Sequence, residues 1–424
     1  MEVATNPKMT ECDVLVVGAG PAGSGAARAC ARAGLKTVIV EKRREIGYPV
    51  HCAEGMGNYL LPFMPFNIPH DQFVWKTDGI EFWAEDITVR RSGVLWSGYT
   101  VNRREFDKWL VRKATKAGAQ LMLETELVDF EFKHNHVVEK AVLRGKQGKV
   151  EIKPKVVVGA DGSDSTTLKL LGEYHPKKGA TAEIYAWEMH NMKLTSPKYE
   201  QIFVGDFTET GYAYVFPISK TKANVGIGCA FPKKPIEEYF NEFLEIPEMK
   251  RQVRNAIRAE DKGGKANALP LCDKWHYGNI LLAGDSADQN FKPFVEGILP
   301  AVICGDIAGK TIAKHIQGKG KLDEYTHNVK QVLEPLLHQS NQVGNLIYDL
   351  FNMKEPKEYL LLLNLLADLN TPEKIRQMQT QTYEHIKDKT LEWQKPQKQI
   401  PTQINEYLYH QYLKTERLIH RLLG

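Results

Sequence analysis

Three glycines near the N-terminus have the spacing of a turn that binds dinucleotides. Gly18, Gly20 and Gly23 form GxGxxG. The first glycine permits a tight bend, the second lets backbone approach a pyrophosphate, and the third allows close packing of helix on sheet. Ala22 would begin a helix whose unpaired N–H groups face the phosphates. Glu41 follows 18 residues after Gly23, where a carboxylate can accept hydrogen bonds from an adenosine ribose, which favours FAD or NAD over NADP.

The residues around this turn predict the elements that must position it. The apolar run Asp13–Val17 is typical of a buried parallel strand. Small residues over Ala22–Ala33 predict the helix, and Gly34 is expected to end it in a left-handed conformation. A lone GxGxxG is a weak signal, but the order of strand, turn, helix, strand and terminal acid indicates dinucleotide binding.

Two later motifs distinguish between the dinucleotides. Lys155–Leu171 is a strand running into GADG and a helix, and Asn279–Ala287 is a strand ending in GD. Both resemble signatures of the flavoprotein monooxygenase and reductase superfamily, which has an FAD domain of the glutathione-reductase type. The resemblance implies that FAD is held non-covalently, with Asp161 and Asp285 at the cofactor and Arg103 near its phosphates. Taken singly, each motif could also be an ordinary capped turn, and Arg103 a solvated arginine.

Two more segments narrow the resemblance. Tyr48–Gly57 (YPVHCAEGMG) and Tyr212–Gly228 (YAYVFPISKTKANVGIG) are similar to the geranylgeranyl reductase family, and within it to archaeal digeranylgeranylglycerophospholipid reductases. The second segment departs from the family motif at Tyr214, where tryptophan is usual. The resemblance implies that Tyr212 and Tyr214 belong to the catalytic cavity for the prenyl chain.

The loop that contains Cys52 is expected to return over the flavin. We expect cofactor contacts from Cys52, Ala53, Gly55, Val128, Gly297 and Ile298. His51 or Glu54 is expected to relay a proton. A lone cysteine is more often a small buried hydrophobe, which is the alternative for Cys52.

One turn departs from the resembled families. Where a glycine-rich turn usually follows the GD motif, this chain has Val295 and Glu296 before Gly297. Glu296 can be interpreted as a new acid or as an exposed carboxylate near a helix start, and the second interpretation is favoured.

The implied chemistry is reduction of an isolated alkene, which needs a hydride and a proton at adjacent carbons in dry surroundings. The substrate would be a geranylgeranyl lipid or diphosphate. The external electron donor, which could be a nicotinamide, a deazaflavin or a ferredoxin, stays open. Alternatives on the same fold are an aromatic or quinone-type monooxygenase and a redox-relay dehydrogenase. The chain has no cysteine after Cys304, which disfavours a relay with a cysteine-ligated cluster.

An apolar tunnel for the substrate would be built from aromatic residues on predicted strands. Ordinary core packing is the alternative reading of these residues. The candidates are Phe82, Trp83, Trp96, Tyr99, Tyr185, Trp187, Phe203, Tyr212, Tyr214 and Phe216.

Composition excludes several other classes. The 424 residues carry a net charge of +4, too mild to indicate a nucleic-acid partner. Six cysteines without a CxxC pair argue against zinc sites, so no metal is expected. The longest apolar stretch, Tyr359–Leu369, is too short for a membrane span, and the N-terminus lacks a signal peptide. The sequence predicts a cytoplasmic protein.

Charge near the C-terminus suggests how such a protein could reach a lipid. Residues 386–424 contain seven Lys or Arg against four Asp or Glu. This segment is therefore a candidate for peripheral contact with the inner face of the membrane.

The predicted fold class is α/β. A Rossmann FAD-binding domain is expected at 12–60, 100–175 and 270–325, with a hairpin at Gly145–Gly148. An inserted antiparallel β-sheet is expected to form the substrate domain at 60–100 and 176–269. In it, Pro235–Glu260 is predicted to be helical, with a break near Pro247. A helical C-terminal region is predicted for 326–424.

Overall fold

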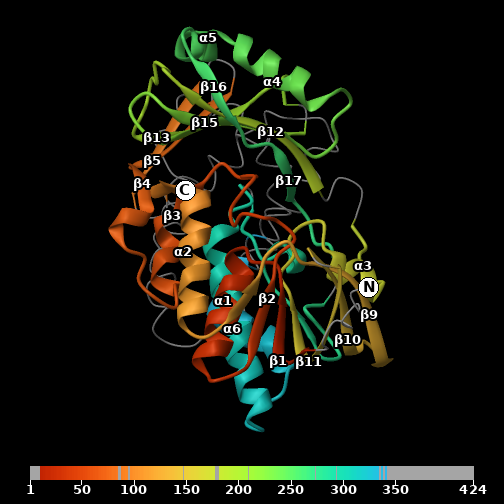
Figure 1. Cartoon of the computed structure of the whole chain (residues 1–424). Helices are drawn as coiled ribbons and strands as arrows, with labels where there is room; N and C mark the ends of the chain where they lie inside the picture. Colours follow the sequence, from red (N-terminus) through yellow and green to blue (C-terminus); the bar gives the residue numbers. More distant parts are fainter. Residues whose placement is uncertain are drawn as a thin grey trace, which may run out of the picture.

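The computed structural model describes residues 10–340, apart from 85–86, 94–95, 147, 177–180, 209, 273, 293, 334–335 and 338–339. Most of the predicted C-terminal region, including Tyr359–Leu369 and the basic segment, lies outside the described residues. Figure 1 shows two stacked parts, each built on one large sheet. Among the described helices, none has the length and apolar character needed to cross a membrane.

The lower part is the predicted nucleotide-binding fold. Its strands follow the order β18-β19-β11-β1-β2-β8, and β1 pairs in parallel with both β11 and β2. The antiparallel hairpin of β10 and β11 at Gly145–Gly148 is confirmed. The strands are β1 (Thr10–Val17), β2 (Thr37–Val40), β8 (Gln120–Met122), β9 (Glu126–His134), β10 (Val137–Gly145), β11 (Gly148–Gly159), β18 (His276–Tyr277) and β19 (Ile280–Leu282).

Small residues let two helices of the lower part approach closely. A methyl group added at Gly305 would lie 2.1 Å from the carbonyl oxygen of Ala22, so only glycine fits at this crossing. Gly34 has φ +81° after the first helix, as predicted for a left-handed cap. The helices of this part are α1 (Pro21–Arg32), α2 (Arg103–Lys116), α3 (Thr166–Leu171) and α6 (Ile298–Ile316), with the 3-10 turn η3 (Gly284–Ala287).

The upper part is a mixed sheet with the order β16-β12-β15-β14-β13-β5-β6, and β17 pairs with β12. The prediction of a wholly antiparallel sheet is wrong at one place, because β13 and β5 pair in parallel. The strands are β5 (Gly79–Ala84), β6 (Ile87–Ser92), β12 (Thr181–His190), β13 (Tyr199–Val204), β14 (Gly211–Pro217), β15 (Ala223–Cys229), β16 (Ile257–Asp261) and β17 (Gly264–Asn267).

Two helices lie over the upper sheet, α4 (Ile236–Glu245) and α5 (Pro247–Val253) (Figure 1). The predicted break at Pro247 is confirmed. The prediction of helix up to Glu260 is wrong, because residues from Ile257 onward join the sheet as β16 beside β12.

A third, three-stranded sheet has the order β3-β7-β4. It pairs β3 (Gly55–Gly57) with β7 (Gly98–Val101), so it fixes the segment that follows Cys52. The third strand is β4 (Phe73–Thr77), and the short turns η1 (Asn58–Phe63) and η2 (His70–Gln72) complete the segment between β3 and β4. Figure 1 places β3 and β4 where the two large parts meet.

Candidate active site

One cavity of about 850 Å³ joins the two parts of the molecule. Its volume lies near the upper end of the roughly 300–1,000 Å³ usual for small-molecule sites. The glycine turn after β1 lines it from below, and one face of the upper sheet lines it from above. A long ligand can therefore reach from the nucleotide turn to the upper sheet within one enclosure.

The nucleotide end of the cavity has the shape that the glycine motif predicts. Gly18 has φ +99°, a conformation that glycine adopts without strain. A methyl group at Gly20 would meet nothing within 4 Å, whereas one at Gly23 would lie 1.9 Å from the Gly18 carbonyl oxygen. Gly20 therefore leaves backbone open to a phosphate, and Gly23 allows the close packing. Gly18, Gly20 and Ala22 line the cavity, and Gly23 lies behind them.

Glu41 shapes the same end of the cavity. Its two carboxylate oxygens accept hydrogen bonds from the backbone N–H groups of Ala19, at 3.0 Å, and Arg43, at 2.9 Å. Glu41 also lines the cavity, and its carboxylate retains lone pairs that can accept from ribose hydroxyls. These residues fit an adenine dinucleotide.

We expect Glu41→Gln to weaken FAD binding by about 10–100-fold, because hydrogen bonds to a charged acceptor contribute about 1.5–3 kcal/mol. An amide would also turn its NH₂ group toward one of the two backbone donors. Titration of the apoprotein with FAD, followed by flavin fluorescence, measures the change.

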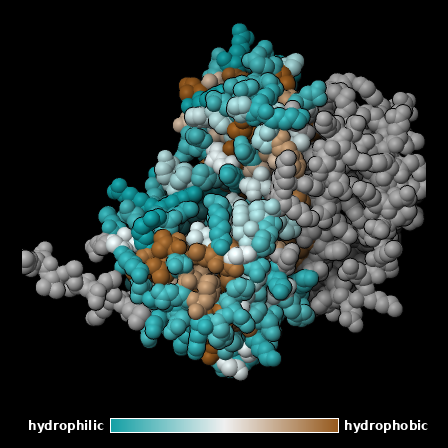
Figure 2. All heavy atoms as spheres, turned by 90° about the vertical axis from the view of Figure 1, so that its right-hand side faces the viewer, coloured by the Kyte–Doolittle hydropathy of each residue, from teal (hydrophilic) through white to brown (hydrophobic). Residues whose placement is uncertain are grey.

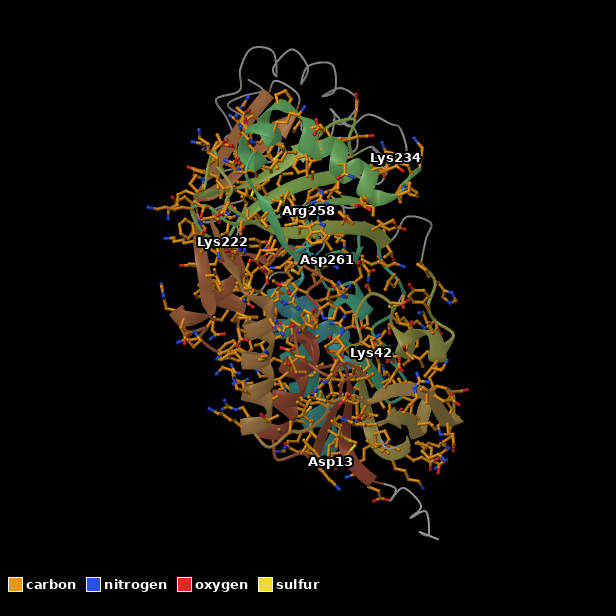
Figure 3. All side chains as sticks on the ribbon, turned by 45° about the horizontal axis from the view of Figure 1, so that its top comes forward. Asp13, Lys42, Lys222, Lys234, Arg258 and Asp261 are labelled. Atoms are coloured by element: carbon orange, nitrogen blue, oxygen red, sulfur yellow. The ribbon has the colours of Figure 1, made fainter. Side chains whose placement is uncertain are left out.

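Asp13→Asn is the matched control for this variant. Asp13 lies within β1 of the same sheet and does not line the cavity, and its carboxylate accepts from Lys36 N at 2.8 Å. Figure 3 shows Asp13 and Lys42, the neighbour of Glu41, well apart on the lower part. FAD affinity of Glu41→Gln equal to that of Asp13→Asn would contradict the role of Glu41.

Asp161 and Asp285 both line the cavity, at the ends of neighbouring strands. The Asp161 carboxylate accepts from Ser165 Oγ at 2.7 Å and from Thr167 N at 2.8 Å, so it also organises the start of α3. Burial raises the pKa of Asp161, and these hydrogen bonds partly oppose the rise. Asp285 Oδ1 accepts from Asn290 Nδ2 at 3.3 Å.

Gly297 and Ile298 line the cavity where α6 begins. A methyl group at Gly297 would lie 3.3 Å from Asp285 Oδ1. The predicted contacts of the GD motif and of the α6 start therefore lie side by side.

The loop before β3 brings His51, Cys52 and Ala53 to the cavity wall, and Gly55 at the start of β3 also lines it. Burial raises the pKa of the Cys52 thiol. His51 Nδ1 is hydrogen-bonded to the carbonyl oxygen of Gly263, which fixes the imidazole at the rim of the upper sheet.

Glu54 also lies on this wall, but its carboxylate is occupied. Its Oε1 accepts from Arg103 N at 2.7 Å, and its Oε2 accepts from Asn224 Nδ2 at 2.8 Å and from Lys262 Nζ at 2.6 Å. This ion-paired carboxylate with three donors holds the loop in place, and its expected part in a proton relay stays a prediction.

Arg103 lines the cavity at the start of α2. Its Nε and Nη2 atoms each lie 2.8 Å from a carboxylate oxygen of Asp107. Burial works against the charge, but Asp107 more than offsets it and the pKa of Arg103 is raised. The cation is thus fixed next to Cys52, and its contact with FAD phosphates stays a prediction.

Eight of the ten aromatic candidates divide between the cavity and the opposite face of the upper sheet, whereas Phe82 and Tyr99 belong to neither group. The cavity side carries Trp96, Tyr212, Tyr214 and Phe216. Tyr185, Trp187, Trp83 and Phe203 instead pack in the cluster that contains residues of α4. The expectation that all ten line a tunnel is therefore corrected, because alternate residues of a strand point to opposite faces.

Val128 is a further correction. Its side chain on β9 is 37% exposed and does not line the cavity, whereas its neighbour Leu127 is buried and does. Figure 2 views the side of the molecule on which β9 lies and shows a hydrophobic area on an otherwise mostly hydrophilic lower part. Strand alternation places Leu127, not Val128, toward the cofactor end.

Two acids in the cavity were missed or misread in the sequence. Glu200 on β13 lines the cavity and is 9% exposed. Glu296 is not an exposed helix-start carboxylate: Oε1 accepts from Gly57 N at 2.6 Å and Oε2 accepts from the Tyr59 hydroxyl at 2.8 Å. A signal for Glu200 existed, since it stands in a run of six strand residues whose other members are mainly apolar.

Comparisons with known proteins agree with this geometry. The family of FAD dependent oxidoreductases matches residues 13–197, and the geranylgeranyl reductase catalytic domain matches residues 181–262. A geranylgeranyl bacteriochlorophyll reductase-like protein from Thermoplasma acidophilum superposes with a TM-score of 0.74 at 23% identity, covering 90% of this chain and all of that one. A flavin-dependent brominase shares the fold at a TM-score of 0.67 and 17% identity, covering 89% of this chain and all of its own.

Sequence relatives are more specific than the shared fold. The digeranylgeranylglycerophospholipid reductase of Methanococcus aeolicus is 33% identical over 74% of this chain and 80% of its own length. The reductase of the same name from Methanocaldococcus jannaschii is 34% identical over 75% of this chain and 82% of its own. With its FAD-binding fold, its shared cavity and these relatives, the chain belongs to the digeranylgeranylglycerophospholipid reductase family.

Proposed function

We propose that this protein is an FAD-dependent reductase that saturates isolated double bonds of geranylgeranyl chains in archaeal membrane-lipid synthesis. The observation that carries the proposal is the single cavity, which runs from the Gly18–Gly23 turn to the aromatic face of the upper sheet. An enzyme of this kind must hold a dinucleotide and a prenyl chain in one enclosure, since the two reacting atoms have to touch.

Different residues along this cavity would hold different parts of the cofactor. Gly18, Gly20, Ala22 and Glu41 would hold the adenosine and phosphate end, with Asp161 and Asp285 nearer the flavin. When bound and reduced, FAD supplies the hydride. The turn at Gly297 and Ile298 and the Cys52 loop would lie against the ring system, since both line the same cavity.

The upper sheet would hold the substrate. Tyr212, Tyr214 and Phe216 present three rings to the cavity from alternate positions of β14. Tyr212 is fixed by a hydrogen bond from its hydroxyl to the Phe294 carbonyl oxygen at 3.0 Å. Such a wall excludes water and orients the chain, and orientation of two reactants can contribute about 7–11 kcal/mol of a barrier.

The test uses the purified holoenzyme, reduced without oxygen and then mixed with a digeranylgeranyl lipid. We expect the absorbance of oxidised flavin to return and the lipid to gain two hydrogens per reduced bond by mass spectrometry. The fully saturated lipid is the control, and it should leave the flavin reduced. Reoxidation by air with incorporation of oxygen into the substrate, and none by the lipid, would instead indicate a monooxygenase.

The electron donor and any membrane contact are separate predictions. A nicotinamide, a deazaflavin or a ferredoxin could reduce the flavin, and the substrate could carry a glycerophospholipid or a diphosphate head group. Peripheral membrane contact rests on the charge of residues 386–424, which lie outside the described residues.

A further inference from the structure

Two carboxyl groups meet on one face of β3. A methyl group added at Gly55 would lie 3.2 Å from Glu200 Oε1, and one added at Gly57 would lie 3.2 Å from Glu296 Oε1. Gly55 and Gly57 are two positions apart on a strand, so their missing side chains would point to the same face. Glu200 from the upper sheet and Glu296 from the turn before α6 are therefore neighbours in the cavity.

The two carboxyls have different partners. Both oxygens of Glu296 accept hydrogen bonds, from Gly57 N and from the Tyr59 hydroxyl. Burial raises the pKa of Glu296, and these two bonds partly oppose the rise because they favour its ionised form. For Glu200, no side-chain hydrogen bond or ion pair occurs within the described part of the chain. One carboxyl is therefore held as an acceptor, while the other is buried, unpartnered and directed into the cavity.

This arrangement changes the pKa of Glu200. Burial raises the pKa of Glu200, and the negative charge of Glu296 raises it further, to about 8. An acid that keeps its proton at neutral pH can give it away in a reaction.

Glu200 is surrounded by residues of the cavity wall that would contact the prenyl chain. On β5, which pairs with β13, the cavity-lining neighbour is the apolar Ile80. On β13 itself the next residue on the cavity side is Ile202. The titratable groups that line the cavity near this end from the other elements include Glu54, Glu296, Tyr59, Cys52, Tyr212 and Tyr214.

We propose that Glu200 is the proton donor in prenyl reduction, and that Glu296 is a positioning residue that acts through Glu200. The role rests on the proposed function. The O–H bond of Glu200 breaks, and the alkene π electrons form a C–H bond with its proton. The hydride from the reduced cofactor forms a C–H bond at the adjacent carbon. The carboxylate left on Glu200 regains a proton from solvent before the next turnover.

The backbone conformation of the turn before α6 is a further observation that supports this proposal. Val295, beside Glu296, has φ +55°, in the left-handed region that strongly disfavours a β-branched residue. The turn thus keeps a conformation suited to glycine while it carries an acid at the next position. Strained residues of this kind are concentrated at functional sites.

The test compares wild-type holoenzyme with Glu200→Gln and Glu296→Gln in single turnovers, reduced without oxygen and mixed with digeranylgeranyl lipid. Removing a general acid typically costs 10²–10⁴-fold, so we expect Glu200→Gln to slow lipid reduction at least ~100-fold with FAD still bound. Glu183→Gln is the matched control, because Glu183 is an exposed carboxyl of the same sheet.

The pH dependence separates the two acids. Wild-type single-turnover rates should fall as pH rises through about 8, where Glu200 loses its proton. Glu296→Gln removes the neighbouring negative charge, so this fall should move to lower pH while the rate near pH 5 stays close to wild type. A second readout needs no turnover. The carboxylic acid C=O infrared band of the oxidised holoenzyme should vanish over the same pH range, and this band should be missing in Glu200→Gln.

Each outcome has one meaning. If wild type reduces no lipid, the proposed function is wrong and the donor role falls with it. If wild type reduces lipid and Glu200→Gln does so within about threefold of its rate, the donor role alone is wrong. An unchanged pH profile in Glu296→Gln overturns the role of Glu296.

Discussion

Gly226→Ala is expected to slow prenyl reduction by about 100-fold without loss of FAD. Gly226 pairs with Tyr214 across β14 and β15, and a methyl group there would lie 2.4 Å from both Cζ and Oη of Tyr214. The same methyl group would lie 2.7 Å from the Cβ atom of Ala186, so it cannot move away from Tyr214 toward Ala186. Tyr214 must tilt off the sheet into the cavity, where it displaces the chain.

The size of the effect follows from positioning. A misplacement of about 1 Å can cost about 100-fold in rate, and overpacking typically destabilises by about 1–3 kcal/mol. Single-turnover reduction of the lipid by holoenzyme measures the rate. Thermal unfolding and the flavin absorbance of the purified protein show whether the fold and the cofactor are retained.

Gly228→Ala is the matched control, since Gly228 lies two residues further along the same strand. A methyl group there would have its nearest contacts at 3.7 Å with Ile184 and at 3.8 Å with the carbonyl oxygen of Glu183, which are ordinary distances. We expect a rate within about threefold of wild type. Equal rates for the two alanine variants would show that the ring of Tyr214 does not set the substrate position.

The nucleotide end of the site was predictable because its signals are local. β1, the turn at Gly18, α1 and Glu41 lie within about thirty residues, and each element has its own pattern of apolar, glycine or small residues. The GADG and GD motifs could be placed for the same reason: each follows directly from a short apolar run at the end of a strand.

The substrate end was less predictable because it depends on which face of a strand is inside. Tyr185 and Tyr212 both belong to alternating aromatic pairs, yet only Tyr212 lines the cavity, since α4 covers the other face. An alternating sequence shows which residues share a face of a strand, but it does not show which of the two faces lines the cavity. The parallel pairing of β13 with β5, which carries Glu200 into the cavity, joins segments more than a hundred residues apart.

The contacts of Glu54 were also not predictable from the sequence. Its role depends on Lys262 and Asn224, which follow it in sequence by about two hundred residues. Asn224 enters from β15, and Lys262 enters from the connection between β16 and β17. No spacing rule predicts that contact. The sequence predicts a proton relay there, which stays a prediction, and only the three donors around the carboxylate show that it also anchors the loop.

Lys262→Met is expected to destabilise the protein by about 3–5 kcal/mol, the usual cost of breaking a buried ion pair from one side. Lys262 Nζ lies 2.6 Å from Glu54 Oε2 and 2.9 Å from Glu188 Oε2, and its side chain is 3% exposed. Without the cation, Glu54 stays buried with an uncompensated charge. Because Glu54 anchors the Cys52 loop, reduced FAD content should accompany the loss, and urea unfolding measures the stability.

Lys222→Met is the control for this variant, because Lys222 is an exposed lysine in the turn between β14 and β15 (Figure 3). We expect it to change stability by less than about 0.5 kcal/mol. The double variant Glu54→Gln with Lys262→Met should recover part of the lost stability, since no charge then remains at position 54. Failure of the double variant to recover any would mean that packing of the lysine stem, and not its charge, stabilises the junction.

The pH dependence gives an independent check with a definite sign. Burial lowers the pKa of Lys262, but Glu54 and Glu188 more than offset this, so its pKa is raised. A raised lysine pKa contributes stability that is complete below the unfolded value of about 10.4 and is lost as pH rises through the folded value. The stability difference between wild type and Lys262→Met should therefore be full at neutral pH and shrink above about pH 10.4. A difference that stays constant through this alkaline range would show that the ion pair is not its source.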